Sequence, residues 1–408
     1  MRKYIIFFLF PVILLGSLVN NSNHNKEISL LESFDINAAF LYDPILNDMR
    51  NKNNQIYKQE HFFKAMDDAY LFIPAIKNVL VEQGVPLEFL YLAMAESNFS
   101  SRAYSKKRAA GLWQFMEATG KVFGLKIDQY VDERRDPIKS TQAAAKFLSY
   151  LHDKFGKWYL AAIAYNCGEG RLSRAIREAG SNELEVLLDE KKKYIPKESR
   201  YYIRKIVALA LVGNDEDHML SSEYEHLLNR ASAYSIATVS LPSGELLSRV
   251  SELTGIPTSD IKALNRHLRY DFVPPYGEGY SLYIPYIKLA EFKQNYKPEP
   301  MARMYKVHTV RNGDTLSEIG KKYGVGYKVI MDFNKLHNSM LRLNQKLIVP
   351  VARTRSYKRE DPVYYLVRKG DTLLSIAKNY KVSVENLKLY NKLSNSIIRV
   401  GDKLKVHE

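Results

Sequence analysis

The chain of 408 residues is too long for one ordinary domain, and its 46% hydrophobic and 26% charged residues exclude a disordered protein. A formal net charge of +15 favours anionic partners, and a single cysteine excludes an intrachain disulfide. Nucleic acid would be the first partner to consider for a cytosolic protein of this charge, so the compartment decides how the charge is interpreted.

The N-terminus predicts an exported protein. Arg2 and Lys3 precede an apolar run over residues 4–15, and polar residues follow from residue 20. These are the parts of a secretory signal peptide over residues 1–20, and the run is short for a membrane-spanning helix. No cysteine lies just after this run, so we expect a periplasmic or cell-envelope protein that is not a lipoprotein and that does not bind nucleic acid.

The next two segments differ in composition. Residues 21–61 are rich in Asn, Lys and Asp, which predicts a flexible N-terminal lead-in with one helix. From residue 62 to residue 215 apolar residues recur at helical spacing, and no alternating strand pattern occurs. The segment 62–215 is therefore predicted to be an all-α domain, followed by a charged linker at 216–235.

One acid in this domain has unusual neighbours. The apolar residues of segment 87–94 have helical spacing, and Glu96 lies at the end of the predicted helix. The aromatic segment Gly111–Met116 follows, in which Trp113 is expected to be part of the core. A carboxyl group beside aromatic surface is poorly solvated when ionised, so its pKa rises. We therefore predict that Glu96 can stay protonated near neutral pH and act as an acid.

Motifs between residues 96 and 202 carry a family resemblance. In chain order they are Glu96-Ser97-x-Phe99, Ala110-Gly111-Leu112-Trp113-Gln114-Phe115-Met116, Asp132-Glu133-Arg134-Arg135-Asp136-Pro137, Ala164-Tyr165-Asn166-x-Gly168 and Ser199-Arg200-Tyr201-Tyr202. Together they resemble soluble-lytic-transglycosylase-like domains. The resemblance implies a lysozyme-like fold that cleaves peptidoglycan glycan strands. Cys167 stands where the family has a small residue and is expected to be a buried filler.

The resemblance implies a reaction that needs one carboxylate, whereas most glycosidases use two. Glu96 would protonate the glycosidic oxygen between N-acetylmuramic acid and N-acetylglucosamine, and the muramyl N-acetyl group would stabilise the cationic centre. Ionised Glu96 would then take the proton of the sugar's own 6-hydroxyl, which closes a 1,6-anhydro ring. Neither a metal nor another cofactor is required, and His308, His337 and His407 lack ligand spacing.

The resemblance also names the residues expected to bind substrate: Ser97, Gln114, Met116, Tyr165, Asn166 and Tyr202. The first two would hydrogen-bond the sugar or position Glu96, the Tyr-Asn pair would line the groove near the N-acetyl group, and Tyr202 would lie close to Glu96. Structural alternatives remain for some of them, since Tyr165 could serve the core and Gln114 could cap the backbone.

A hydrolytic muramidase of the same fold is an alternative, because water could replace the 6-hydroxyl. That reaction needs a second carboxylate, for which Asp132, Glu133 and Asp136 are the candidates. In the family this motif is structural, with the arginines pairing the acids. A non-catalytic wall-binding protein is a further alternative, although binding alone does not require an acid at Glu96.

Two C-terminal segments repeat each other. Residues 305–349 and 362–406 align without a gap at 19 identities in 45 positions. Each has a strand, a Gly-Asp-Thr turn, two short helices and a closing strand, which predicts βααβ domains at 303–350 and 362–408. They resemble the LysM domain, a carbohydrate-binding module of cell-wall enzymes. The resemblance places the glycan against the turns, at Gly313, Asp314, Thr315, Leu316, Gly370, Asp371, Thr372 and Leu373.

The LysM turn residues have a structural alternative, because Gly and Asp serve turns and Leu serves cores. A weaker third copy lies within 236–290 and lacks Gly-Asp-Thr, which predicts a degenerate LysM-like spacer domain. Segments 291–302 and 351–361 are predicted linkers. Residues 301–408 hold 22 Lys and Arg against 9 Asp and Glu, which suits a cell-wall polymer or peripheral association with a membrane.

The sequence thus predicts a multidomain protein with an all-α, lysozyme-like catalytic domain followed by small βααβ LysM domains. The expected activity is that of a monomeric lytic transglycosylase, which cleaves the β-1,4 bond of peptidoglycan without water. Two weak glycan-binding modules on one chain would gain affinity for a polymer through effective concentration.

Overall fold

The computed structural model describes residues 23–56, 60–215, 235–276, 279–297, 304–351 and 364–406, the last without 381, 392 and 394. The chain divides at Val351 into two compact units, which are described separately. The predicted signal peptide at 1–20 and nearly all of the predicted linkers at 216–235 and 351–361 lie outside the described residues.

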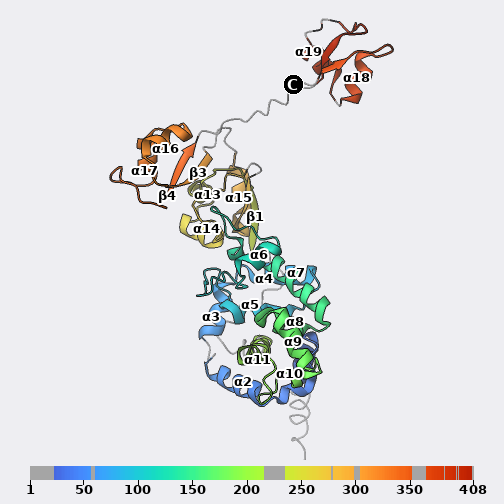
Figure 1. The fold of residues 1–408 in the computed structure, drawn as a ribbon, viewed down its shortest axis with the longest axis vertical. Coiled ribbons are helices and arrows are strands. Elements are labelled where there is room, and N and C mark those ends of the chain that lie inside the picture. Colours follow the sequence, from blue (N-terminus) through green and yellow to red (C-terminus); the bar gives the residue numbers. More distant parts are fainter. Residues whose placement is uncertain are drawn as a thin grey trace, which may run out of the picture. The chain divides into compact units, whose positions relative to one another are not determined.

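The first unit begins with a helical block, drawn from blue to green in Figure 1. It contains a helix over residues 23–33, η1 (Ala38–Tyr42), α2 (Pro44–Ile56), α3 (Glu60–Asp68), α4 (Ile73–Glu82), η2 (Leu87–Phe89), α5 (Leu90–Ser97), α6 (Glu117–Val122), η3 (Glu133–Arg135), α7 (Pro137–Phe155), α8 (Trp158–Cys167), α9 (Glu169–Ala179), α10 (Leu184–Leu187) and α11 (Lys197–Gly213). Within its described residues only isolated β-bridges occur, so the all-α prediction is confirmed.

The core of the block forms where α5, α7, α8 and α11 pack together. Buried alanines on α7 (143–145) and α8 (161, 162 and 164) let these two helices approach closely. Trp113 is fully buried beside α7, and its indole Nε1–H donates to Thr141 Oγ1 at 2.9 Å. A buried indole needs such an acceptor, and the prediction that Trp113 belongs to the core is confirmed.

The prediction of a flexible lead-in is wrong for residues 23–56. Leu31, Phe34 and Leu46 are fully buried in the same core as α5, α7, α8 and α11. The carboxylate of Asp35 also accepts the backbone N–H of Trp158 at the start of α8, at 2.7 Å. The polar composition of the segment had a different cause: its helices bury one side only, so most of their other positions face water.

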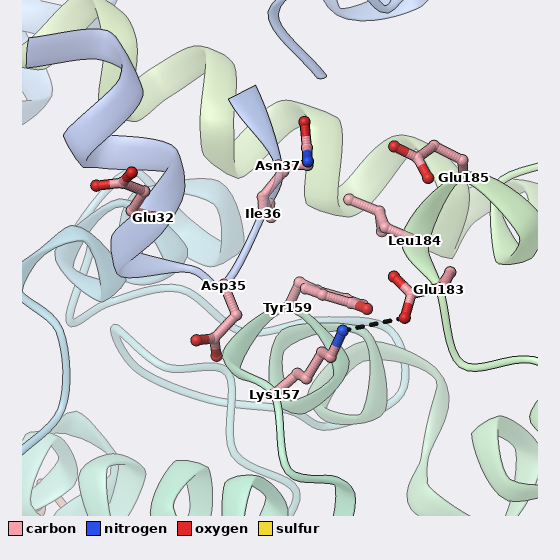
Figure 2. A pocket seen from close by; sticks show the side chains of 9 residues that line it. All are labelled: Glu32, Asp35, Ile36, Asn37, Lys157, Tyr159, Glu183, Leu184 and Glu185. Atoms are coloured by element: carbon pink, nitrogen blue, oxygen red, sulfur yellow. Dashed lines mark hydrogen bonds and ion pairs between the residues drawn. The ribbon is translucent and has the colours of Figure 1, made fainter. Parts of the chain in front are cut away.

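This N-terminal segment also closes a cavity of about 380 Å³ against the start of α8 and the loop before α10. Figure 2 shows its acidic lining, with Glu32 and Asp35 on one side and the Lys157–Glu183 ion pair on the other. None of the residues predicted to bind substrate lines it.

A small mixed domain follows, with β1 (Ile236–Leu241), α13 (Leu247–Thr254), α14 (Thr258–Leu264), β2 (Tyr280–Pro285), η5 (Tyr286–Lys288) and α15 (Leu289–Asn295). Strands β1 and β2 pair antiparallel, with Ile236 opposite Pro285 and Leu241 opposite Tyr280. The predicted linker from residue 291 is wrong over α15, because Phe292 anchors that helix in the domain's core.

This domain contacts the helical block through the Asp-Glu-Arg-Arg-Asp motif. A domain that served only as a spacer would not need such specific contacts. The hydroxyl of Tyr280 donates to Glu133 at 2.6 Å, and that of Tyr283 donates to Asp136 at 2.8 Å. Asp136 also caps α7 by accepting the backbone N–H of Ile138. Buried carboxylates are costly unless they are hydrogen-bonded, so these contacts tie the two domains into one unit.

The arginines of the motif behave differently from each other. Arg134 donates two hydrogen bonds to Asp132, both at 2.8 Å, as the resemblance implied. Arg135 pairs with no acid among the described residues and donates instead to the backbone carbonyls of Ser101 and Arg102.

The two LysM copies have the predicted βααβ order. The first contains β3 (Met304–Thr309), α16 (Leu316–Tyr323), α17 (Tyr327–Phe333) and β4 (Lys346–Val351), and it belongs to the first unit. The second unit contains β5 (Tyr364–Leu366), α18 (Leu373–Asn379), α19 (Val384–Tyr390) and β6 (Lys403–Lys405). In each copy the two strands pair antiparallel.

An asparagine clamps each of the three small domains. The side chain of Asn391 donates to the carbonyls of Leu387 and Lys405 and accepts the N–H of Lys405, at 2.7–2.8 Å. Asn265 and Asn334 make the same three bonds in their own domains. The amide therefore ties the second helix to the closing strand, which explains its place in the repeat.

Replacing Asn391 by Ala should destabilise the second LysM domain by about 2 kcal/mol or more, because it leaves backbone groups at the helix–strand junction without partners. Hydrogen exchange of the full chain measures this as a loss of about 30-fold or more in protection of β5 and β6. Asn395→Ala is the matched control, since Asn395 is exposed and makes one local bond to the Ile397 N–H. Equal protection in both variants would contradict the clamp.

Candidate active site

Helix α5 presents Glu96 in its last turn and then stops. Asn98 caps the helix in the left-handed conformation (φ 51°), and Phe99 continues the turn at φ 58°. Ser97 Oγ donates to the carbonyl of Leu112 at 2.8 Å, which holds the end of α5 against the aromatic segment. Gly111 begins this contact at φ 79°, where a Cβ atom would lie 1.7 Å from a backbone oxygen of η3. No residue with a side chain fits there.

Helix α11 supplies the hydrogen-bond donor to Glu96 and a nearby positive charge. The hydroxyl of Tyr202 donates to Glu96 Oε1 at 2.5 Å, and the tyrosine is buried. One turn later on the same face, Lys205 Nζ donates to the carbonyl of Ala95 at 2.7 Å. The carboxyl group of Glu96 therefore has one hydroxyl donor and also feels the positive charge of the half-buried Lys205 ammonium group.

The net environment raises the pKa of Glu96. Burial is the largest cause, because it disfavours the ionised carboxylate. The Tyr202 hydrogen bond and the positive charge of Lys205 act in the opposite direction, while the nearby negative charge of Glu198 raises the pKa further. A carboxyl group of raised pKa is suited to donate a proton near neutral pH, which is the property predicted from the aromatic surroundings.

Helix α8 brings Tyr165 and Asn166 to the same place. Tyr165 donates its hydroxyl to the carbonyl of Trp113 at 2.7 Å, and burial together with the charge of Glu96 raises its pKa. Asn166 Oδ1 accepts a hydrogen bond from Ser199 Oγ at 2.6 Å. Fixing the oxygen in this way sets the orientation of the amide, whose NH₂ group has no protein acceptor among the described residues.

The other expected substrate contacts lie along the aromatic segment. Gln114 adopts φ 46° and donates Nε2–H to the carbonyl of Gly111 at 2.8 Å, which is the backbone-capping role left open from the sequence. Met116 precedes α6 and is 45% exposed. Cys167 is only half-buried at the end of α8, where burial raises the pKa of its thiol.

Two charged residues near Glu96 were not anticipated. Lys205 and Glu198 both lie on α11, three residues after and four residues before Tyr202. Residues at these spacings share one face of a helix, so the motif that placed Tyr202 at Glu96 could also have placed these two.

The carboxylates proposed for a hydrolytic reaction are engaged elsewhere. Burial favours the protonated form of Asp132, but its hydrogen bonds with Arg134 and the positive charges of Arg134 and two neighbouring arginines outweigh burial and lower the pKa of Asp132. Glu133 and Asp136 accept hydrogen bonds from the LysM-like domain, as described above. Glu198, which is exposed, is the carboxylate whose charge acts on Glu96.

In the LysM turns the predicted glycan-binding residues also carry structural roles. Gly313 and Gly370 adopt positive φ, and the following aspartates accept backbone N–H groups at 2.7 Å. Thr315 and Thr372 cap α16 and α18, while Leu316 and Leu373 are buried. His308 contacts Asp314 and Tyr323. Any glycan contact by the buried leucines would therefore involve backbone atoms.

No group of three or more His, Cys, Asp or Glu side chains within the described residues could hold a metal ion. Among the same residues, no helix combines the length and apolar character that a membrane crossing requires.

Comparison with known proteins defines the class. The profile of the transglycosylase SLT domain matches residues 75–187, and that of the LysM domain matches 308–350 and 365–407. A third profile, "Lytic transglycosylase MltD, LysM-like domain", matches 235–300, so the weak third copy is LysM-like. Together with the helical fold around Glu96, these matches define a lytic transglycosylase with LysM modules.

Membrane-bound lytic murein transglycosylase D of Escherichia coli is 30% identical over 339 residues, which cover 79% of this chain and 73% of that protein. The chain belongs to this family. Partial similarity extends to an autolysin of Enterococcus faecalis, 36% identical over 108 residues that cover 24% of this chain and 15% of that protein. The solved lytic transglycosylase Slt of Pseudomonas aeruginosa, an inactive mutant, is 24% identical with a TM-score of 0.31, covering 35% of this chain and 24% of that one.

Proposed function

We propose that this protein is a peptidoglycan lytic transglycosylase in which Glu96 is the single acid and base. The carrying observation is a half-buried carboxyl group of raised pKa that accepts a hydrogen bond from Tyr202 and lies beside Lys205. Family membership supports the reaction class, and the LysM modules support a glycan polymer as substrate. Because this reaction needs only one carboxylate, Asp132, Glu133 and Asp136 can serve in structural contacts.

The reaction proceeds without water. Protonated Glu96 gives its proton to the glycosidic oxygen, the C1–O bond of N-acetylmuramic acid breaks, and N-acetylglucosamine leaves with a free 4-hydroxyl. The muramyl N-acetyl oxygen stabilises the positive charge at C1. The sugar's 6-hydroxyl oxygen then bonds to C1, and its proton returns to Glu96, which restores the enzyme. Lys205 and Tyr202 stabilise the ionised carboxylate between the two proton transfers.

The expected substrate contacts have matching chemistry. The NH₂ group of Asn166, which has no acceptor among the described residues, is a donor for the N-acetyl carbonyl oxygen, and Gln114 leaves its Oε1 as an acceptor for a sugar hydroxyl. Ser97 holds the end of α5 in place, and Met116 offers an exposed apolar side chain to a sugar face. We further propose that the protein is exported by its N-terminal signal peptide, works as a monomer in the periplasm or cell envelope, and associates peripherally with the wall.

The product distinguishes this reaction from hydrolysis. Peptidoglycan digested in ¹⁸O-labelled water by the purified protein should yield muropeptides that end in 1,6-anhydromuramic acid, one water lighter than reducing-end products and free of label. Mass spectrometry of the products measures both properties. Labelled reducing ends would make the enzyme a muramidase, and Glu198 would then be the first carboxylate to replace.

A further inference from the structure

A second cavity lies beside the candidate active site, where the LysM-like domain meets the helical block. Its volume is about 420 Å³, within the range of small-ligand pockets. Asn98, Phe99 and Leu112 line one side, and Arg266 of the LysM-like domain lines another. Because the Leu112 carbonyl also accepts the Ser97 Oγ bond, this wall is shared with the residues that position Glu96.

Guanidinium groups gather at this cavity, and no carboxylate of the described residues forms an ion pair with them. Arg102 and Arg266 line it, and Arg135 lies close enough that both neighbouring arginines, after burial, lower the pKa of Arg266. None of the three forms an ion pair within the described residues. Asp68 is the one carboxylate of the lining, and its ion-pair partner is Lys64 at 3.8 Å.

A half-buried arginine that is repelled by two others destabilises the fold unless an anion joins it. Arg266 is half-buried, and the described residues offer its guanidinium neither an ion pair nor a hydrogen bond. Its planar fork of donors matches a carboxylate, which it can bind through two parallel hydrogen bonds. The cavity therefore has the character of a site that receives its anion from outside the protein.

We infer that this cavity binds the carboxylates of the peptide stems carried by the glycan strand. The inference rests on the proposed function, because the muramic acid whose bond is cleaved at Glu96 is also the sugar that bears the stem. In a peptide-bearing strand the lactyl carboxyl group forms an amide, so the free carboxylates belong to the stems. A stem that leaves the sugar near the α5 end meets the wall formed by Asn98 and Leu112, with Arg102 and Arg266 beyond it.

The test is a binding measurement on the full chain carrying Glu96→Gln, which prevents cleavage. The probes are a tetrasaccharide with peptide stems and the same compound with its stem carboxylates converted to amides. Adding Arg266→Gln should weaken binding of the acidic probe about 10-fold or more and leave binding of the amidated probe unchanged. The matched control is Arg177→Gln, which removes an exposed arginine at the end of α9.

Stability gives a second readout. Because Arg266 has no ion-pair or hydrogen-bond partner among the described residues and is repelled by its neighbours, Arg266→Gln should keep or raise the melting temperature of the free protein. If Arg266→Gln weakened the binding of both probes equally and lowered the melting temperature, Arg266 would have a structural role and the inference would be overturned. Unchanged binding of the acidic probe would also overturn it. Failure of the proposed function would show separately, as an absence of anhydro products from the unmodified enzyme.

Discussion

Replacing Glu96 by Gln should lower the rate of anhydro-product release by about 10³-fold or more, because the amide can neither give nor take the transferred proton. Gln has nearly the same shape, and Tyr202 can still donate to its oxygen, so binding of glycan strands should remain. Release of 1,6-anhydromuropeptides measured over time gives the rate. The exposed Glu178→Gln variant, altered in the same way on α9, should retain the wild-type rate.

The same variant has a second expected effect, on stability. Burial raises the pKa of Glu96 in the folded state, so the unfolded chain ionises first as pH increases. As the pH rises from the ordinary pKa of a glutamate to the raised pKa of Glu96 in the folded state, the free energy of unfolding of wild type therefore falls relative to that of Glu96→Gln. Above the raised pKa the difference between the two proteins stays constant. Melting temperatures should favour the Gln variant near neutral pH and converge in acid. A difference that does not change with pH would contradict the raised pKa.

The sequence predicts the repeated elements best, because one physical requirement recurs in them. The asparagine that clamps each small domain appears as Asn334 and Asn391 in the repeat and as Asn265 in the weak copy. The capping threonines and buried leucines of the turns recur for the same reason. In this part of the chain, local hydrogen-bonding requirements therefore make the fold predictable from the sequence.

The sequence predicts less where contacts join distant segments. The polar composition of residues 23–56 did not indicate packed helices. The side of these helices that is buried becomes apparent only when they are seen packed on α8 and α11. Glu133 and Asp136 resemble catalytic acids until Tyr280 and Tyr283 are placed beside them. The three arginines of the second cavity come from separate segments, so no local pattern brings them together.

The pH dependence of the reaction should move in opposite directions when the neighbours of Glu96 are changed. The first step needs protonated Glu96, so the rate falls as pH rises through its raised pKa. Tyr202→Phe removes a donor to the ionised carboxylate and Lys205→Met removes a positive charge, so each should raise that pKa and move the alkaline limb to higher pH. Glu198→Gln removes a negative charge and should move it to lower pH. Tyr165 remains neutral throughout, because its own pKa is well above the ordinary value.

Rates measured from acid to alkaline pH for the three variants separate electrostatics from simple damage. Tyr202→Phe should also lower the maximal rate about 10-fold to 100-fold, since a charge-assisted hydrogen bond to the catalytic carboxylate is lost. Glu198→Gln should keep a maximal rate near that of wild type if lytic cleavage uses one carboxylate, and should lose it if Glu198 activates water. If the alkaline limbs of the pH–rate profiles moved in the same direction for all three variants, these side chains would act on Glu96 through packing and not through charge.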